Sequence, residues 1–116
     1  MALKYIKTQV SNIYTDDGLH KSVRLLDEQI THDVSSYKYG EETIPGNTID
    51  FEIASDVNYC VIVVKSLTNI NIKVGNTTST SLNGIKQFIY DGATSDIFIS
   101  NPINDTIVVS FVTAKY

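Results

Sequence analysis

Few residues in this sequence are suited to nucleophilic, acid–base or metal chemistry. The two histidines, His20 and His32, lie in polar stretches, and Cys60 is the only cysteine, so these residues complete neither a zinc site nor a disulfide. Cys60 belongs to the apolar run YCVIVV, whereas a reactive thiolate needs a basic, half-exposed setting with a nearby histidine. We therefore expect Cys60 to be buried and inert, and both histidines to be solvated at the surface.

The carboxylates occur in pairs that do not suggest catalysis. The pairs are Asp16 with Asp17, Glu41 with Glu42, and Asp50 with Glu52. The first two pairs fall in expected turns, and the third points outward from an expected strand. Catalytic carboxylates need burial and a partner that separates their pKa values. Because the sequence also lacks an EF-hand calcium loop and a glycine-rich phosphate loop, it predicts no enzyme, no cofactor and no metal site.

The composition limits the classes of partner. The chain has 116 residues, of which 42% are hydrophobic and 19% charged, and its net charge is −4. This length suits one domain. An acidic chain without a basic stripe is not expected to bind nucleic acid. No run approaches the ~20 apolar residues of a membrane span, and residues 1–10 lack the apolar core of a signal peptide. We expect a soluble protein made in a cytoplasm, without membrane contact.

Alternating apolar residues and regularly spaced turn signals indicate an all-β fold. Polar and apolar residues alternate over residues 49–53 and 70–74, and residues 59–65 form an apolar run long enough for a central strand. Turn signals stand at residues 40–47, which include Pro45 and Gly46, and at 56–58, 68–69, 75–76, 83–84, 91–92 and 101–102. Gly46 is expected to take the positive φ of a type II turn. This spacing favours an antiparallel β-sandwich, jelly-roll-like or Ig-like, of about eight strands.

The two most apolar alternating segments lie within residues 97–114 and read as a hairpin closed by an Asn-Pro turn. In its second strand, Val109 and Phe111 lie on one face and Val108 and Val112 on the other. A single domain of this size covers one face of a terminal hairpin with its second sheet, so the other face is expected to lie against another subunit. The sequence therefore predicts a homo-oligomer with these four residues near the contact.

Residues 1–24 are separated from the regular strands by the strong turn signal Thr15, Asp16, Asp17 and Gly18. We interpret residues 1–24 as an N-terminal arm or oligomerisation segment and residues 25–116 as the β-sandwich domain. Leu3 and Tyr5 are the arm's apolar candidates for an oligomer contact.

Tyrosines are abundant and tryptophan is absent. The seven are Tyr5, Tyr14, Tyr37, Tyr39, Tyr59, Tyr90 and Tyr116. Exposed tyrosines stack on sugar rings in small carbohydrate-binding sandwiches, but they also pack at interfaces and edge strands with the hydroxyl in water. We favour the interface role and keep a carbohydrate-binding or host-attachment module as the alternative.

The order of features from Leu25 to Tyr116 resembles small structural proteins of tailed-phage virions. The segments that carry the resemblance are LLDEQI, the PG turn, TIDFEIAS, VIVVKS, NIKVG, FIYDG and the closing SDIFISNPINDTIVVSFVTAKY. The resemblance implies a β-sandwich, often jelly-roll-like, that assembles as an oligomer, with a trimer favoured, on a capsid, neck, tail or baseplate. It supplies no catalytic residues.

The sequence as a whole therefore favours a non-enzymatic virion protein of the decoration, cement or tail-associated type. Such a protein is made in the host cytoplasm and binds copies of itself and a neighbouring virion protein. A glycan-binding module is the main alternative, and a small inhibitor or regulatory β domain is a third.

Overall fold

The structure is a computed structural model that describes residues 5–9, 13–14, 22–23, 29–65 and 68–116, with side chains from residue 34 onward. The chain divides into two compact units, Met1–Val34 and Ser35–Tyr116. In the first unit, β1 (Tyr5–Gln9) pairs antiparallel with β4 (Gln29–Asp33), and β2 (Ile13–Tyr14) pairs with β3 (Ser22–Val23). The expected domain boundary between residues 24 and 25 lies outside the described residues.

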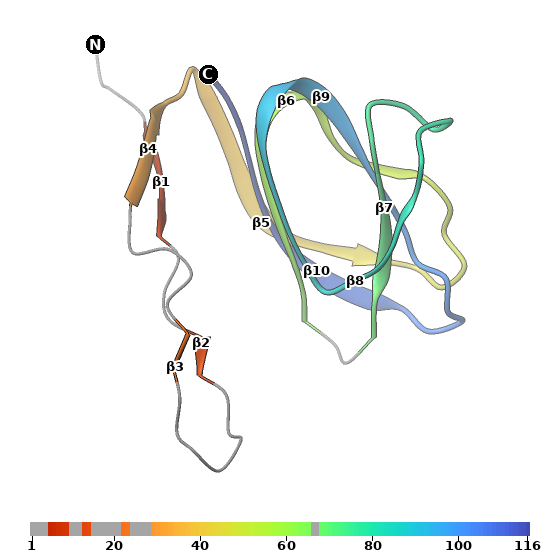
Figure 1. Cartoon of the computed structure of the whole chain (residues 1–116). Helices are drawn as coiled ribbons and strands as arrows, with labels where there is room; N and C mark the ends of the chain where they lie inside the picture. The colour runs from red at the N-terminus through yellow and green to blue at the C-terminus, as the bar shows by residue number, and fades with distance from the viewer. Residues whose placement is uncertain (1–4, 10–12, 15–21, 24–28, 66–67) are drawn as a thin grey trace. The chain divides into compact units, whose positions relative to one another are not determined.

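The second unit is a six-stranded antiparallel sheet (Figure 1). Its strands are β5 (Ser36–Ile44), β6 (Phe51–Val64), β7 (Ile70–Val74), β8 (Leu82–Ile85), β9 (Gln87–Ser100) and β10 (Ile107–Lys115). They lie in the order β5-β10-β6-β9-β7-β8, which makes β5 and β8 the edges of the sheet. The described residues contain no helix, so the all-β prediction is confirmed. Accordingly, none of the described segments is a helix long and apolar enough to cross a membrane.

The two central strands, β6 and β9, are 14 residues long and bend over together (Figure 1). Their pairing shifts register between Glu52 and Tyr59, where β-bulges bend the sheet. Residues 59–64 of β6 pair with β10, whereas residues 97–100 of β9 pair with β7. The predicted turns at residues 56–58 and 91–92 are therefore wrong, and so is the turn predicted at residues 83–84, which lie within β8. Asp56, with φ of 58°, gives a bulge in a continuous strand because the ladder to β9 resumes beyond it.

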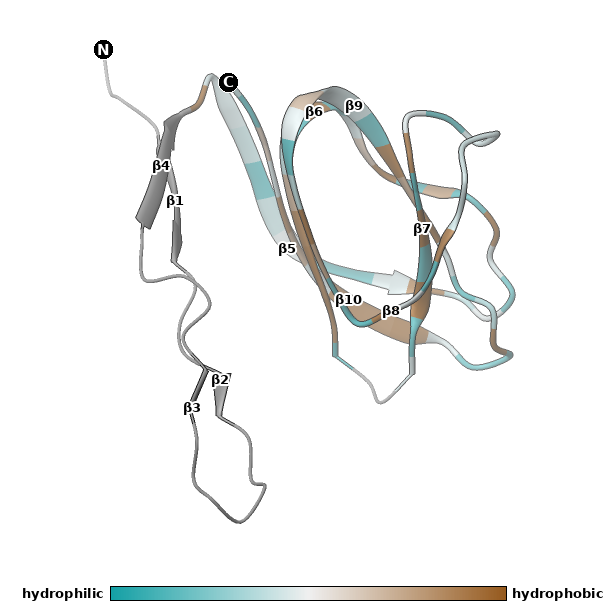
Figure 2. Ribbon diagram, in the orientation of Figure 1, coloured by the Kyte–Doolittle hydropathy of each residue, from teal (hydrophilic) through white to brown (hydrophobic). Residues whose placement is uncertain are grey.

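One hydrophobic cluster forms the core, and it takes residues from both sides of the bend. The buried members are Ile44, Ile53, Ala54, Val57, Cys60, Ile62, Val64, Ile70, Ile72, Ile97, Ile99, Ile107, Val109 and Phe111. Figure 2 shows the hydrophobic segments that β7 and β10 contribute. Each fully buried aliphatic or aromatic side chain contributes roughly 1.5–3 kcal/mol. Burial of the apolar side chains is favourable, so the face of each strand that carries the alternating apolar residues is the face that the core covers.

The predicted hairpin over residues 97–114 is wrong, because β9 and β10 are not neighbours in the sheet. β10 lies between β5 and β6, and β6 separates it from β9. The connection between them begins at Asn101, whose buried side chain binds backbone carbonyls of the β5 end and of its own loop. β10 is buried on one face and half-buried on the other, and it pairs with two strands of its own chain, β5 and β6.

The turn after β5 lies where the sequence predicts it, but the conformation differs. Asn47, with φ of 59°, occupies the left-handed region, and Gly46 does not. A Cβ atom on Gly46 would lie 2.0 Å from the carbonyl oxygen of Asn104, so glycine is required there for close backbone contact. The expectation that Gly40 to Asn47 all lie in the turn is also wrong, because β5 continues unbroken to Ile44 opposite β10.

Candidate interaction surface

The outer face of the sheet, opposite the core, carries a row of apolar side chains across four adjacent strands. Val112 of β10 lies directly opposite Tyr39 of β5 on one side and Val61 of β6 on the other, and Val61 lies opposite Ile89 of β9. We call these four residues the outer row. Tyr39 is 72% exposed and Ile89 57%, while the two valines are half-buried. A contiguous exposed apolar surface of this kind is typical of interaction sites.

The sequence identified only part of this surface. Val108 and Val112 are half-buried on the outer face, while Val109 and Phe111 are buried in the core. Leu3 lies outside the described residues, and Tyr5 is described only as part of the β1 backbone. Whether these residues contact another subunit stays a prediction.

Three members of the outer row were missed by the sequence analysis. The sequence marks Tyr39 only as one of seven tyrosines, and it gives no signal that sets Val61 or Ile89 apart. Val61 belongs to a run of consecutive apolar residues, in which a period of two cannot show which side chains face outward. Only the register with β9 and β10 places Val61 beside Ile89 and Val112.

Two tyrosines form an exposed pair at the edge of this surface. The rings of Tyr37 and Tyr39 have centroids 6.2 Å apart and planes inclined by 9°, and the residues are 52% and 72% exposed. By contrast, Tyr59 is 4% exposed, and the hydroxyl of the half-buried Tyr90 donates to the carbonyl oxygen of Ala93. Nearly parallel exposed rings can bind an apolar or a sugar surface.

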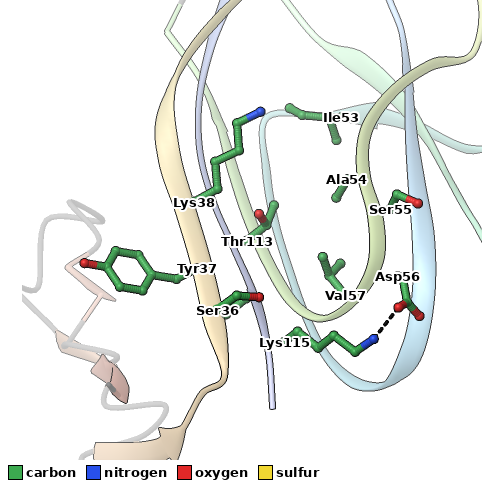
Figure 3. A pocket seen from close by; sticks show the side chains of 11 residues that line it. Ser36, Tyr37, Lys38, Ile53, Ala54, Ser55, Asp56, Val57, Thr113 and Lys115 are labelled. Atoms are coloured by element: carbon green, nitrogen blue, oxygen red, sulfur yellow. Dashed lines mark hydrogen bonds and ion pairs between the residues drawn. The ribbon is translucent and has the colours of Figure 1, made fainter. Parts of the chain in front are cut away.

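A cavity of about 420 Å³ opens on the inner side between β5, the bulge of β6 and the end of β10 (Figure 3). Lys38 points toward this cavity, while Tyr37 points to the opposite side of β5. The ammonium group of Lys115 pairs with the Asp56 carboxylate at one end. The Asp56 carboxylate is therefore paired with an ammonium group and exposed to solvent. A catalytic carboxylate is normally found in a buried environment, which differs from this one.

A second cavity, of about 410 Å³, is lined mainly by polar residues near the start of β6. Lys73 lines this cavity, and its Nζ lies 3.1 Å from Asp50 Oδ1 and donates to the Thr77 carbonyl at 3.0 Å. The backbone N–H of Asp50 donates to Ser100 Oγ at 2.9 Å. These contacts give Lys73, Asp50 and Ser100 a structural role, because they hold the segment between β5 and β6 in place.

The predicted burial of Cys60 is confirmed, since its side chain is fully buried in the core. Burial raises the pKa of the Cys60 thiol to about 12, because the apolar core destabilises the thiolate. Within the described part of the chain, no three histidine, cysteine or carboxylate side chains come together as a metal site. His20 lies outside that part, and His32 is described only as backbone in β4.

Comparison of the sequence with models of known protein families and with curated proteins finds no match.

Proposed function

We propose that this chain is a non-enzymatic structural protein of a virion, which associates with copies of itself and with a neighbouring capsid, neck or tail protein. The virion assignment depends on the resemblance of residues 25–116 to small structural proteins of tailed phages. The observation that supports association is the outer row, where Tyr39, Val112, Val61 and Ile89 present apolar surface over four strands. Covering this surface with a partner removes apolar area from water, which favours association by roughly 25 cal/mol for each Å² that is buried.

The same proposal treats the bent sheet as a two-layered β-sandwich. One layer would contain β5, β10 and the halves of β6 and β9 beside them, and the other would contain β7, β8 and the remaining halves. Support comes from the register shifts in β6 and from the core, which draws on residues of both halves, such as Ile53 and Ile62. A sandwich of this kind leaves the outer faces for partners while the inner faces fold the chain.

The self-association part is tested by changing a residue of the outer row and a matched residue of the core. Val112→Asp is expected to leave a folded chain of lower mass in light scattering at tens of micromolar. Val109→Asp is expected to unfold the chain, because Val109 is completely buried and an unpaired carboxylate there costs several kcal/mol. Circular dichroism separates the two results. A monomeric wild type, or a Val112→Asp variant with unchanged mass, would contradict the role of the outer row.

The virion part is tested separately, by antibody detection of the chain in gradient-purified particles of the phage that encodes it. Detection at a fixed copy number per particle supports the assignment. Its absence from particles, with abundant chain in the lysate, contradicts the assignment without affecting the self-association test.

A carbohydrate-binding role is the second candidate, and the parallel pair of Tyr37 and Tyr39 is the observation that favours it. Both rings are exposed, and an exposed aromatic ring offers an apolar face on which a pyranose ring can stack. An array of pyranose-containing glycans is the direct test. Binding that is lost in both Tyr37→Ala and Tyr39→Ala, with the fold intact, would support this candidate, and absence of binding to every glycan would exclude it from consideration.

A further inference from the structure

The two edges of the six-stranded sheet are protected to different degrees. β8 is four residues long, contains Gly84 with φ of 71°, and has an irregular register with β7. Short, irregular strands of this type prevent further pairing. β5 is nine residues long, contains no proline, and keeps an unbroken register with β10 over nine residue pairs. Within the unit Ser35–Tyr116, β5 therefore presents a regular strand edge with a neighbour on one side only.

An antiparallel strand directs the N–H and C=O groups of alternate residues to each side. The side of β5 away from β10 thus carries a row of backbone donors and acceptors that fits another extended strand. When two identical strands pair antiparallel across a two-fold axis perpendicular to the sheet, the axis lies midway between the strands, level with the same residue in both copies. Residues of the same face then lie opposite one another. Each possible register is therefore defined by the one residue that lies opposite its own copy, and we call this residue the centre.

The side chains of β5 select one of these registers. A centre at Lys38 places two lysines opposite each other, and a centre at Glu41 or Glu42 places two glutamates opposite each other, which is unfavourable. A centre at Tyr39 brings no opposite charges together. A centre at Gly40 places Lys38 of each copy opposite Glu42 of the other and uses all nine residues of the strand.

The charges of Lys38 and Glu42 are available for such a contact. Among the described residues, neither has an ion-pair partner within the chain, whereas Glu41 is paired with Lys65 at 2.5 Å. Lys38 Nζ lies 5.8 Å from the centre of the Phe111 ring, which holds the ammonium group on the inner side of β5. The two residues are four positions apart on one strand and on the same face, roughly 13 Å from each other, which is too far for an ion pair between them.

We propose that two copies of the chain pair through their β5 edges, antiparallel about a two-fold axis at Gly40, with Lys38 of each copy opposite Glu42 of the other. This inference depends on the self-association in the proposed function, and it adds a contact of defined symmetry at the sheet edge to the outer row on the sheet face. It extends the six-stranded sheet of each copy into one continuous sheet. Directly opposed side chains at this spacing have Cβ atoms roughly 4.5–5.5 Å apart, within reach of an ion pair.

The test uses charge reversal at both positions, measured by analytical ultracentrifugation of the full chain. Lys38→Glu and Glu42→Lys each convert both opposed pairs into like-charge pairs, so each variant is expected to dimerise at least about tenfold more weakly than wild type. The double variant restores opposite charges and is expected to regain the wild-type dimer. An equimolar mixture of the two single variants is expected to form a heterodimer, since each supplies the charge that the other lacks.

Glu52→Lys is the matched control, because Glu52 is exposed on β6, a strand that takes no part in the proposed β5 contact, and the charge change is the same. It is expected to leave the dimer unchanged. An oligomer that dissociates in Val112→Asp but is insensitive to every β5 variant would overturn the two-fold contact and leave the proposed self-association standing. A wild type that is monomeric at every concentration would overturn both. Failure of the double variant and of the mixture to recover the dimer, with all chains folded, would also overturn the β5 contact.

Discussion

Asn101 and Ile44 are 57 residues apart in the chain and are joined by a hydrogen bond of 3.2 Å from Asn101 Nδ2 to the Ile44 carbonyl oxygen. The same amide nitrogen lies 3.0 Å from the Pro45 carbonyl and 2.8 Å from that of Asp105. Asn101 is 1% exposed, and its Oδ1 accepts from the Ile103 backbone N–H. One buried side chain therefore holds the end of β5 against the loop that leads into β10.

Asn101→Ala is expected to lower the free energy of unfolding by roughly 2–3 kcal/mol, because it leaves the buried Ile44 carbonyl and two part-buried carbonyl groups without this donor. Chemical denaturation provides the measurement. Asn104→Ala is the control, since its hydrogen bond with Asn47 is exposed and a smaller loss, of about 1 kcal/mol or less, is expected. Equal losses in the two variants would show that the buried amide has no special role.

Gly46→Ala is expected to destabilise the chain by about 1–3 kcal/mol, because the new methyl group meets the rigid backbone of residue 104. Gly92→Ala is the matched control, since its nearest neighbour would be the Tyr90 hydroxyl at 3.4 Å, an ordinary contact. Thermal unfolding of both variants tests the difference. A Gly46→Ala variant as stable as Gly92→Ala would mean that the two loops do not approach as the structure describes.

The half-buried ion pair between Lys73 and Asp50 is expected to stabilise the chain more than the exposed pair between Lys65 and Glu41. The side chains of the first pair are 23% and 20% exposed, and those of the second are 51% and 56% exposed. Lys73→Met is expected to cost about 1–2 kcal/mol, because it leaves a partly desolvated carboxylate unpaired. Lys65→Met is expected to change stability by no more than about 0.5 kcal/mol. Urea denaturation at low salt compares them, and the reverse order would contradict this assignment.

The Cys60 thiol is expected to react slowly with a thiol reagent at neutral pH and to make stability fall at alkaline pH. The folded chain keeps the thiol protonated up to a pKa of about 12, while the unfolded chain ionises it near 9.0. Above pH 9.0 the unfolded state therefore binds fewer protons, and the free energy of unfolding falls with a slope that approaches about 1.4 kcal/mol per pH unit.

The measurement for Cys60 is the slope of stability against pH between pH 9 and 10.5, compared with Cys60→Ala. The other titrating groups contribute to both chains, so the difference between the two slopes belongs to the thiol. Rapid labelling of native wild type, or identical slopes in the two chains, would contradict the burial argument.

The sequence alone was sufficient to predict an all-β chain and a buried Cys60, and it identified the alternating segments. Local pattern carries this information, because a period of two in residues 107–111 decides which side chains share a face. It also places Val109 and Phe111 together on one side of β10, and the structure buries that side.

Only the tertiary structure decided which strands are neighbours. Residues 97–114 read as a hairpin because short connections usually join adjacent strands, yet β10 inserts between β5 and β6. The turn signal at residues 56–58 became a bulge for the same reason, since long ladders on both sides of Asp56 outweigh a local preference. The outer row and the position of β5 at the edge of the six-stranded sheet depend on these long-range pairings. Local sequence determines which face of a strand is apolar, whereas the sheet order that gives each face its neighbours is set by packing between residues far apart in the chain.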